Sequence, residues 1–426
     1  MVDPSEARLH FERAHAQFVA TGDCLGTLLA CAGVLETSYY RLGEQATALP
    51  WVDELDRLSS RFPALSPEIE LRVVQGLLGA WMAQPQHPML PGWAQRAAEL
   101  IRASPHARSN AAPIAFATGW YIWAGEYGQA RAVLEHVRLD QGMIQSAPLN
   151  AISACISLCG IAWQDGNHEE ALETAQLART IADRSGVHVL DSVIAAQCVY
   201  TALSAGDAQL ANEELAIVAA HSRAGAELHS SHYRFLRAGV LLLEGRLAEA
   251  LDVAQRELPV AEALAAPFMT ATWRIQLAQL LALGGRLRES REQLSAAFAF
   301  AQAMPSHILQ FHALLTSAWA GFLGNDEQQG GEALRRGLAI GRERNYLNCH
   351  PLWIPEMMAD LLSRALESGI EVDYARRLIR KRRLSPGDRY PERWPWPVRI
   401  YTLGRFEVRL EDQPEDQPVQ ASGKAK

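Results

Sequence analysis

The sequence of 426 residues predicts an all-α protein in which helical hairpins stack into a superhelix. Two observations carry this prediction. A glycine-centred turn recurs about every 40 residues, and small side chains stand at fixed distances from each glycine. Self-similarity at such a period is typical of a helical solenoid, which also suits a chain of this length.

The six turns lie in the middle of the chain, with glycines spaced 41, 40, 39, 40 and 39 residues apart. An apolar run of helical length precedes each glycine, and an amphipathic run follows it. Each unit is therefore expected to consist of helix A, a turn, helix B and a short loop. The central glycines are Gly125, Gly166, Gly206, Gly245, Gly285 and Gly324.

Small side chains on both helices keep a constant phase with these turns. Five residues after the glycine stand Ala130, Ala171, Ala211, Ala250 and Ser290. Seven residues before it stand Thr118, Cys159, Val199, Ala238, Ala278 and Ser317, which are small apart from Val199 and Thr118. Small residues allow two helices to approach closely, and glycine allows the backbone to turn between them.

This pattern resembles a tetratricopeptide solenoid. The unit is longer than the standard of roughly 34 residues, and the W-x2-L-G-x2-Y signature is absent. The longer period also suits armadillo and HEAT arrays, which remain structural alternatives. In all three, each hairpin buries its apolar face against the next, so the core is a stripe along a superhelix.

The array is expected to extend in both directions. Residues 5–20 and 24–43 predict an opening hairpin around Gly22, residues 51–62, 67–83 and 93–103 predict less regular helices, and residues 351–369 and 372–383 predict a last hairpin. The predicted organisation is irregular hairpins over 1–110, regular repeats over 111–385, a Pro-rich linker over 386–397, a β-hairpin over 398–411 and a disordered polar tail over 412–426.

The β-hairpin prediction rests on alternation. Val398, Ile400 and Thr402 alternate with Arg399 and Tyr401, a bend follows, and residues 405–410 alternate again. Two strands alone are marginally stable, so this segment looks like the first piece of a further domain.

The stretch ALESGIEVDYARRLIRKRRLSP…WPWPVRIYTLGRFEVRLEDQP resembles a junction in large bacterial ATP-dependent transcriptional regulators. In that family, of maltose-activator-like or antibiotic-regulator-like architecture, a tetratricopeptide-like sensor region runs into a winged-helix DNA-binding domain. The family's "I…LGxFxV" strand pair is matched by Ile400, Leu403, Gly404, Phe406 and Val408. The opening FVATGDCLGTLLACAGVLETSYY also resembles the start of the family's helical region.

The chain departs from the family plan in two ways. It has no G-x-x-x-x-G-K-[ST] phosphate loop and no recognition helix. We therefore expect no cofactor in this segment, with ATP implied only for the full-length family. DNA contact is expected only through a domain completed beyond residue 426.

Candidate ligand-binding residues are found by counting back from each turn glycine along helix A. The side chains 13, 9 and 6 residues before the glycine are expected to face the concave side of the superhelix. They are Gln197, Tyr200, His232, Gln276 and Gln279, with Ser157 beside them. A groove of amides, aromatics and histidine suits a small-molecule effector, a peptide or a protein segment. The alternative is that the amides are solvated while aromatics such as Trp273 and Trp353 pack between repeats.

One dense basic run could contact DNA phosphates beside a winged helix. The alternative is that it forms the solvated face of the last helix, paired with neighbouring acids. Its residues are Arg376, Arg377, Arg380, Lys381, Arg382 and Arg383.

No enzyme is predicted. The histidine pairs His229/His232 and His307/His312 lack a glutamate in an HExxH arrangement, so neither catalytic residues nor a metal site are expected.

The six cysteines form no CxxC pair and are expected to be buried, reduced thiols. The net charge of −8 excludes a nucleic-acid coat protein, and no apolar run reaches the ~18 residues of a membrane helix. A cytoplasmic protein is expected, because the charged N-terminus does not resemble a signal peptide.

Together these features predict the sensor region of a bacterial transcriptional regulator. It would bind an effector or partner in the superhelical groove and control flanking NTPase and DNA-binding domains. The alternative function is a stand-alone scaffold for protein–protein interaction.

Overall fold

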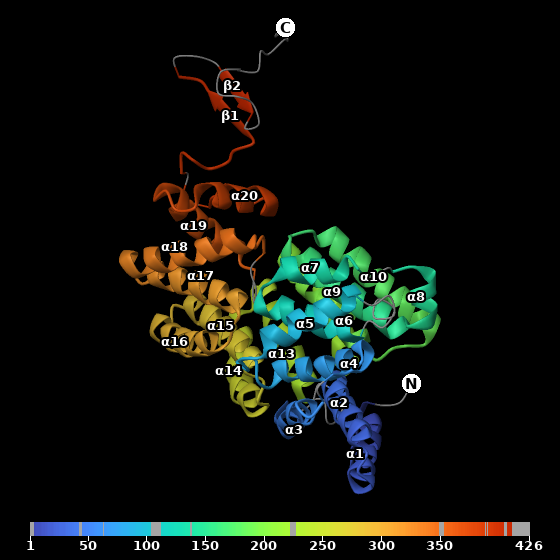
Figure 1. The fold of residues 1–426 in the computed structure, drawn as a ribbon. Coiled ribbons are helices and arrows are strands. Elements are labelled where there is room, and N and C mark those ends of the chain that lie inside the picture. The colour runs from blue at the N-terminus through green and yellow to red at the C-terminus, as the bar shows by residue number, and fades with distance from the viewer. Residues whose placement is uncertain are drawn as a thin grey trace.

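A computed structural model describes residues 4–41, 45–62, 64–103, 112–136, 139–221, 227–348, 353–387, 389, 391–403 and 407–410. Within these residues the chain folds into 20 α-helices and one two-stranded sheet. Consecutive helices pair as antiparallel hairpins that stack side by side (Figure 1). The predicted all-α, tetratricopeptide-like superhelix is confirmed.

Six regular hairpins form the body of the superhelix. They are α6 (Ala112–Ala124) with α7 (Tyr127–Leu134), α9 (Pro148–Gln164) with α10 (His168–Ser185), α11 (Asp191–Ala205) with α12 (Ala208–Ala220), α13 (Glu227–Leu243) with α14 (Leu247–Ala263), α15 (Pro267–Leu283) with α16 (Leu287–Ala303), and α17 (His307–Leu323) with α18 (Glu327–Arg344). A short helix, α8 (Gln141–Ser146), precedes the second hairpin.

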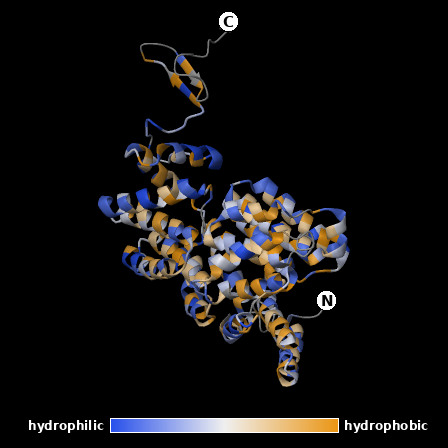
Figure 2. Cartoon of the chain, viewed as in Figure 1, coloured by the Kyte–Doolittle hydropathy of each residue, from blue (hydrophilic) through white to orange (hydrophobic). Residues whose placement is uncertain are grey.

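Less regular elements flank this body at both ends. They are α1 (Pro4–Thr21), α2 (Cys24–Arg41), the 3₁₀ helices η1 (Gln45–Ala48) and η2 (Gly79–Met82), α3 (Leu49–Ser59), α4 (Pro67–Leu78), α5 (Leu90–Ala103), α19 (Pro355–Glu367) and α20 (Val372–Arg382). Apolar residues recur along the whole stack rather than in one centre (Figure 2). The core therefore follows the stack of helices, as one large apolar cluster and two smaller ones.

The turns behave as predicted in five of the six regular hairpins. The predicted glycines there have φ between +66° and +84°, a region that residues with a side chain rarely adopt. The sixth turn differs, because Asn325 takes the left-handed conformation with φ +57° and Gly324 does not. Asparagine tolerates this region better than most residues. The register of the sixth hairpin is therefore centred one residue later than predicted.

The small side chains lie where the two helices of a hairpin meet. Ala130, Ala171, Ala211, Ala250 and Ser290 are each 0% exposed. The Ser290 hydroxyl donates to the backbone oxygen of Ala278, the small position on the facing helix, at 2.8 Å. In the shifted sixth hairpin the equivalent small positions are Ala318 and Gly330, and Gly330 also lies close to Gly321. A Cβ on Gly321 would lie 3.0 Å from the Gly330 backbone.

The C-terminal segment forms the predicted antiparallel pair, β1 (Val398–Tyr401) and β2 (Glu407–Leu410), with Val398 opposite Leu410. Figure 1 shows it apart from the helices, at the end of an irregular linker. Gly404 and Phe406 of the family motif and the predicted disordered tail lie outside the described residues.

The cysteines follow the prediction with one correction. Cys31, Cys155, Cys159 and Cys198 are buried, and burial raises the pKa of each thiol to about 12. Cys24 is exposed, because it begins α2 at the outer end of the first hairpin. Cys349 lies outside the described residues.

Replacing a small interhelical residue should destabilise the fold. Ala250→Leu adds three carbon atoms to a position with no exposed surface, which we expect to lower the free energy of unfolding by about 2 kcal/mol. Ala248 lies on the exposed side of the same helix, so Ala248→Leu is the matched control. Urea unfolding followed by circular dichroism measures both; equal midpoints for the two variants would contradict the packing argument.

Candidate functional site

The predicted concave residues form a polar ladder between successive A helices. The Tyr200 hydroxyl and His232 Nε2 are 2.7 Å apart, which joins α11 to α13. Trp163 on α9 donates from its indole nitrogen to the Tyr200 backbone oxygen at 3.0 Å. These bonds connect three consecutive hairpins.

The ladder continues into α15, where the amides are buried rather than facing a groove. Gln276 donates from Nε2 to the backbone oxygen of Phe235 at 3.0 Å. Both Gln276 and Gln279 are 0% exposed, and between residues 270 and 282 only Arg274 is partly exposed. The expectation that these two glutamines line an open groove is therefore not met. Gln197, Tyr200 and His232 are half-buried, so they retain some accessible surface.

Burial keeps the Tyr200–His232 pair uncharged. Desolvation, followed by the nearby His229, lowers the pKa of His232 to about 4. Desolvation also raises the pKa of Tyr200 above its ordinary value. Both groups are neutral at pH 7, so the pair joins the two hairpins by a neutral hydrogen bond between aromatic rings.

The C-terminal third of the superhelix returns to the first three turns. We call this contact the closing seam: Ser306, Arg344, Tyr346, Asn348, Lys381 and Arg382 on one side, and the turns near Gly125, Gly166 and Gly206 on the other. Ser306 donates to the Trp123 backbone oxygen and Tyr346 to that of Gly125, both at 2.7 Å. Arg344 pairs with Glu126 at 2.6 Å.

Asn348 occupies the middle of the seam with 1% of its surface exposed. Its Nδ2 donates at 2.9 Å both to the Trp163 backbone oxygen and to the Ser204 hydroxyl. The partners are 185 and 144 residues away in sequence, so the bonds tie distant hairpins together.

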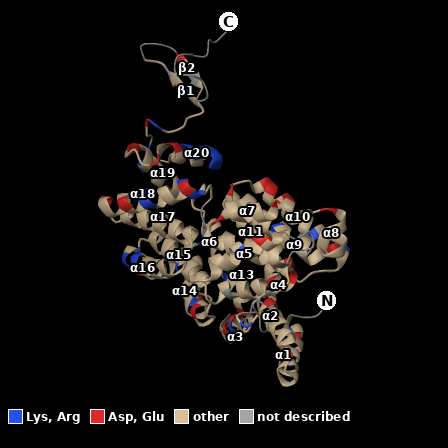
Figure 3. Cartoon of the chain, in the orientation of Figure 1, with Lys and Arg blue, Asp and Glu red and all other residues tan. Residues whose placement is uncertain are grey.

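Some residues of the basic run on α20 make contacts within the protein, and the others are exposed to solvent. Arg382 donates to the Ser204 backbone oxygen at 2.6 Å and lies 3.9 Å over the Trp353 ring, and Lys381 donates to Asn167 Oδ1. Arg376 donates to the Arg393 backbone oxygen at 3.1 Å. The remaining basic residues of the run, Arg377, Arg380 and Arg383, are exposed at the basic end of α20 (Figure 3).

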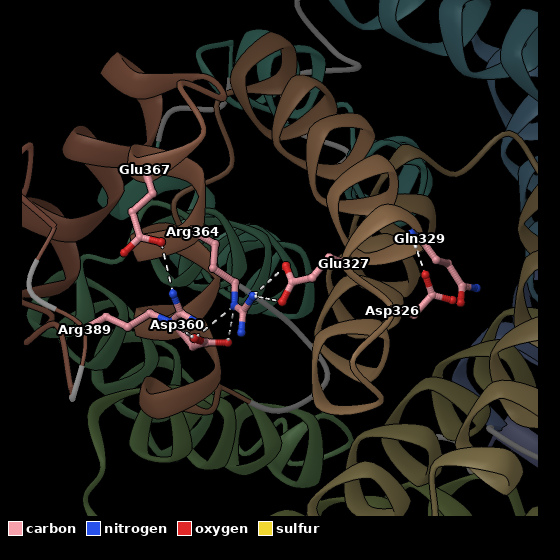
Figure 4. A network of polar contacts seen from close by, with 7 residues as sticks. All are labelled: Asp326, Glu327, Gln329, Asp360, Arg364, Glu367 and Arg389. Atoms are coloured by element: carbon pink, nitrogen blue, oxygen red, sulfur yellow. Dashed lines mark hydrogen bonds and ion pairs between the residues drawn. The ribbon is translucent and has the colours of Figure 1, made fainter.

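A charged pocket lies between the last two hairpins and the linker. Its volume is about 180 Å³. Figure 4 shows Arg364 between Glu327 and Asp360, with Arg389 reaching Asp360 and Glu367. Arg364 also stacks on the Phe322 ring at 4.0 Å. The residues that line the pocket are Phe322, Glu327, Gly331, Leu334, Arg364, Glu367, Ser368, Ile370 and Arg389.

The pocket network attaches the linker to the helices. Two guanidinium groups meet three carboxylates, so each positive charge is already matched. Arg389 lies in the linker, and Trp394 further along it is 2% exposed. These contacts connect the last hairpins to the segment that leads to β1.

The described residues hold no group of three or more His, Cys, Asp or Glu side chains that could bind a metal ion. Across the same residues, no helix combines the length and apolar character needed to span a bilayer.

Comparisons with known proteins agree on the fold. The tetratricopeptide repeat model matches residues 231–256, which span the turn between α13 and α14. No curated protein matches the chain. The crystal structure of Rap protein complexed with competence and sporulation factor is similar, with a TM-score of 0.59 and 9% identity. The similarity covers 84% of this chain and 97% of that chain.

Acid should weaken the fold through His232. Its pKa is about 4 when folded and ordinary when unfolded, so the unfolded chain binds more protons between these values. Stability is therefore retained above pH ~6.5 and falls as the pH approaches 4, by roughly 2–3 kcal/mol from this residue. His232→Gln keeps a partner for Tyr200 but does not titrate. We expect it to reduce the pH dependence of the urea midpoint, with His10→Gln, at a side chain 64% exposed, as the matched control.

Loss of Arg389 should free the linker without unfolding the helices. Its side chain is 38% exposed, so its two ion pairs contribute at most about 1 kcal/mol to global stability. Arg389→Ala should speed trypsin cleavage of the linker after Arg393 severalfold while the thermal midpoint stays nearly constant. Arg383→Ala, on the exposed end of α20, is the control. An unchanged cleavage rate in Arg389→Ala would show that Trp394 alone holds the linker.

Proposed function

We propose that this chain is a regulatory interaction module that binds a peptide or protein segment along its helical hairpins. The observation that carries the proposal is the run of consecutive hairpins, similar in fold over 84% of the chain to a Rap protein complexed with competence and sporulation factor. Helical repeats present extended surfaces that suit elongated partners. The proposal gives the chain no catalytic role and no resident cofactor.

The half-buried ladder residues are the proposed contact points. Gln197, Tyr200 and His232 lie on A helices and keep some accessible surface. Their amide, hydroxyl and imidazole groups can exchange hydrogen bonds with a peptide backbone. Gln276 and Gln279 would support this surface from within, because they are buried behind it.

At a finer level, we propose that the module is the sensor region of a cytoplasmic bacterial transcriptional regulator. The support is the resemblance of residues 397–410 to the opening strands of a winged-helix domain, together with a linker fastened by Arg389. Binding along the hairpins would shift the population of superhelix curvatures and move the linker. ATP and DNA would then act through other domains of the parent protein, and the exposed Arg377, Arg380 and Arg383 would lie beside the DNA.

Binding can be tested with a random peptide display library selected on the purified chain, followed by calorimetry with the selected peptides. We expect specific binders in the micromolar range whose affinity falls about tenfold in Gln197→Ala. Gln176→Ala, at an exposed position on α10, should have no effect. Equal affinities for the two variants would place binding away from the ladder, and a failure to select any peptide would count against the function.

The stand-alone scaffold remains the second candidate, and the linker separates the two. If the module controls a following domain, Arg389→Ala should change the affinity for a selected peptide, because binding and linker attachment are then coupled. If the chain is a plain scaffold, the unmodified chain and Arg389→Ala should bind the selected peptide with the same affinity.

A further inference from the structure

We propose that Arg382, at the end of α20, and Asn348 act as a latch that holds the superhelix closed, and that their release opens it. The latch is a property of this chain alone. Its use by a binding partner rests on the proposed function.

Arg382 is held by three different contacts at once. Its guanidinium donates to the Ser204 backbone oxygen at 2.6 Å and to the Ser204 hydroxyl at 3.0 Å. The same group stacks 3.9 Å over the Trp353 ring. Ser204 lies in the last turn of α11, where unpaired backbone oxygens attract a positive charge. Arg382 therefore caps the C-terminal end of α11, where its partner Ser204 lies 178 residues earlier in the sequence.

Lys381 and Arg382 both pack on the turn at Gly166, which precedes α10. Lys381 donates to Asn167 Oδ1, in the turn before α10. A Cβ placed on Gly166 would lie 3.2 Å from Arg382 Cδ and 3.5 Å from Lys381 Cε. The two basic side chains thus pack directly on the turn. His168 beside them is kept neutral, because burial and then the charges of Arg382 and Lys381 lower its pKa to about 4.

Asn348 connects the latch to the rest of the seam. Because the Ser204 hydroxyl bonds to both Asn348 and Arg382, the two contacts share one partner and should break together. A hydrogen bond from a charged donor shifts an equilibrium by roughly tenfold or more. The few hydrogen bonds of the seam therefore favour the closed state strongly. A partner that binds the open state more tightly can still shift the equilibrium toward it.

An aromatic surface lies beneath the seam. The Trp123 ring is 3.9 Å from Phe268 on α15 and 4.0 Å from Trp81, measured between ring centroids. The three rings also line a small pocket of about 10 Å³. Ser306 bonds to the Trp123 backbone, so this packing is continuous with the seam. Opening would expose more of Trp81, Trp123 and Phe268, which would give the bound segment an apolar contact in addition to the ladder residues.

The test compares Arg382→Gln with Arg377→Gln, which removes the same charge from the exposed side of the same helix. Hydrogen exchange and small-angle X-ray scattering are measured on the full chain without a partner. For Arg382→Gln we expect amide exchange about tenfold faster at residues 163–168 and 202–207, faster exchange near Trp123, and a larger radius of gyration. Arg377→Gln should match the unmodified chain.

Exchange and scattering in Arg382→Gln that equal those of Arg377→Gln would overturn the latch. If Arg382→Gln loses helical circular dichroism, Lys381→Gln is judged by the same criterion, with about threefold faster exchange at residues 163–168 expected and no change overturning the proposal. These readouts need no peptide, so a failed latch is distinguishable from a module that binds nothing.

Discussion

The close approach of the A and B helices at small side chains is the constraint on which the rest of the structure depends. Five positions with no exposed surface fix how near the two helices of a hairpin lie. That spacing sets the rise and rotation from one hairpin to the next, and hence the curvature of the superhelix. The seam can form only because this curvature brings Ser204 back to Arg382.

Contacts within and between neighbouring hairpins were largely predictable from the sequence, because they repeat. The turns and the small positions of the regular hairpins follow from spacing, whereas the end elements keep the period less well. The sixth turn escaped, since both Gly324 and Asn325 suit a turn and the spacing of about 40 residues does not distinguish them. The glutamines of α15 escaped too, because Gln276 bonds to the Phe235 backbone oxygen of the neighbouring hairpin, and the spacing of residues does not indicate such a partner.

The closing seam was the least predictable part of the structure, although the basic run that contains Arg382 stands out in the sequence. Arg382 belongs to a run whose other exposed members look alike in sequence, and nothing in the run distinguishes the residue that faces Trp353. Asn348 carries no periodic signal at all. Contacts across nearly two hundred residues depend on accumulated curvature, which small deviations in each hairpin alter.

The glycine turns differ in how freely they can vary. At Gly206, Gly245 and Gly285 a side chain would meet nothing within 4 Å, so only backbone conformation favours glycine there. At Gly125 a Cβ would lie 2.0 Å from the Tyr346 hydroxyl, which belongs to the far end of the chain. Substitutions should therefore accumulate unevenly along the repeats. Asparagine can take the place of glycine in turns where a side chain meets nothing, as it does at Asn325, whereas Gly125 is fixed by a neighbour 221 residues away.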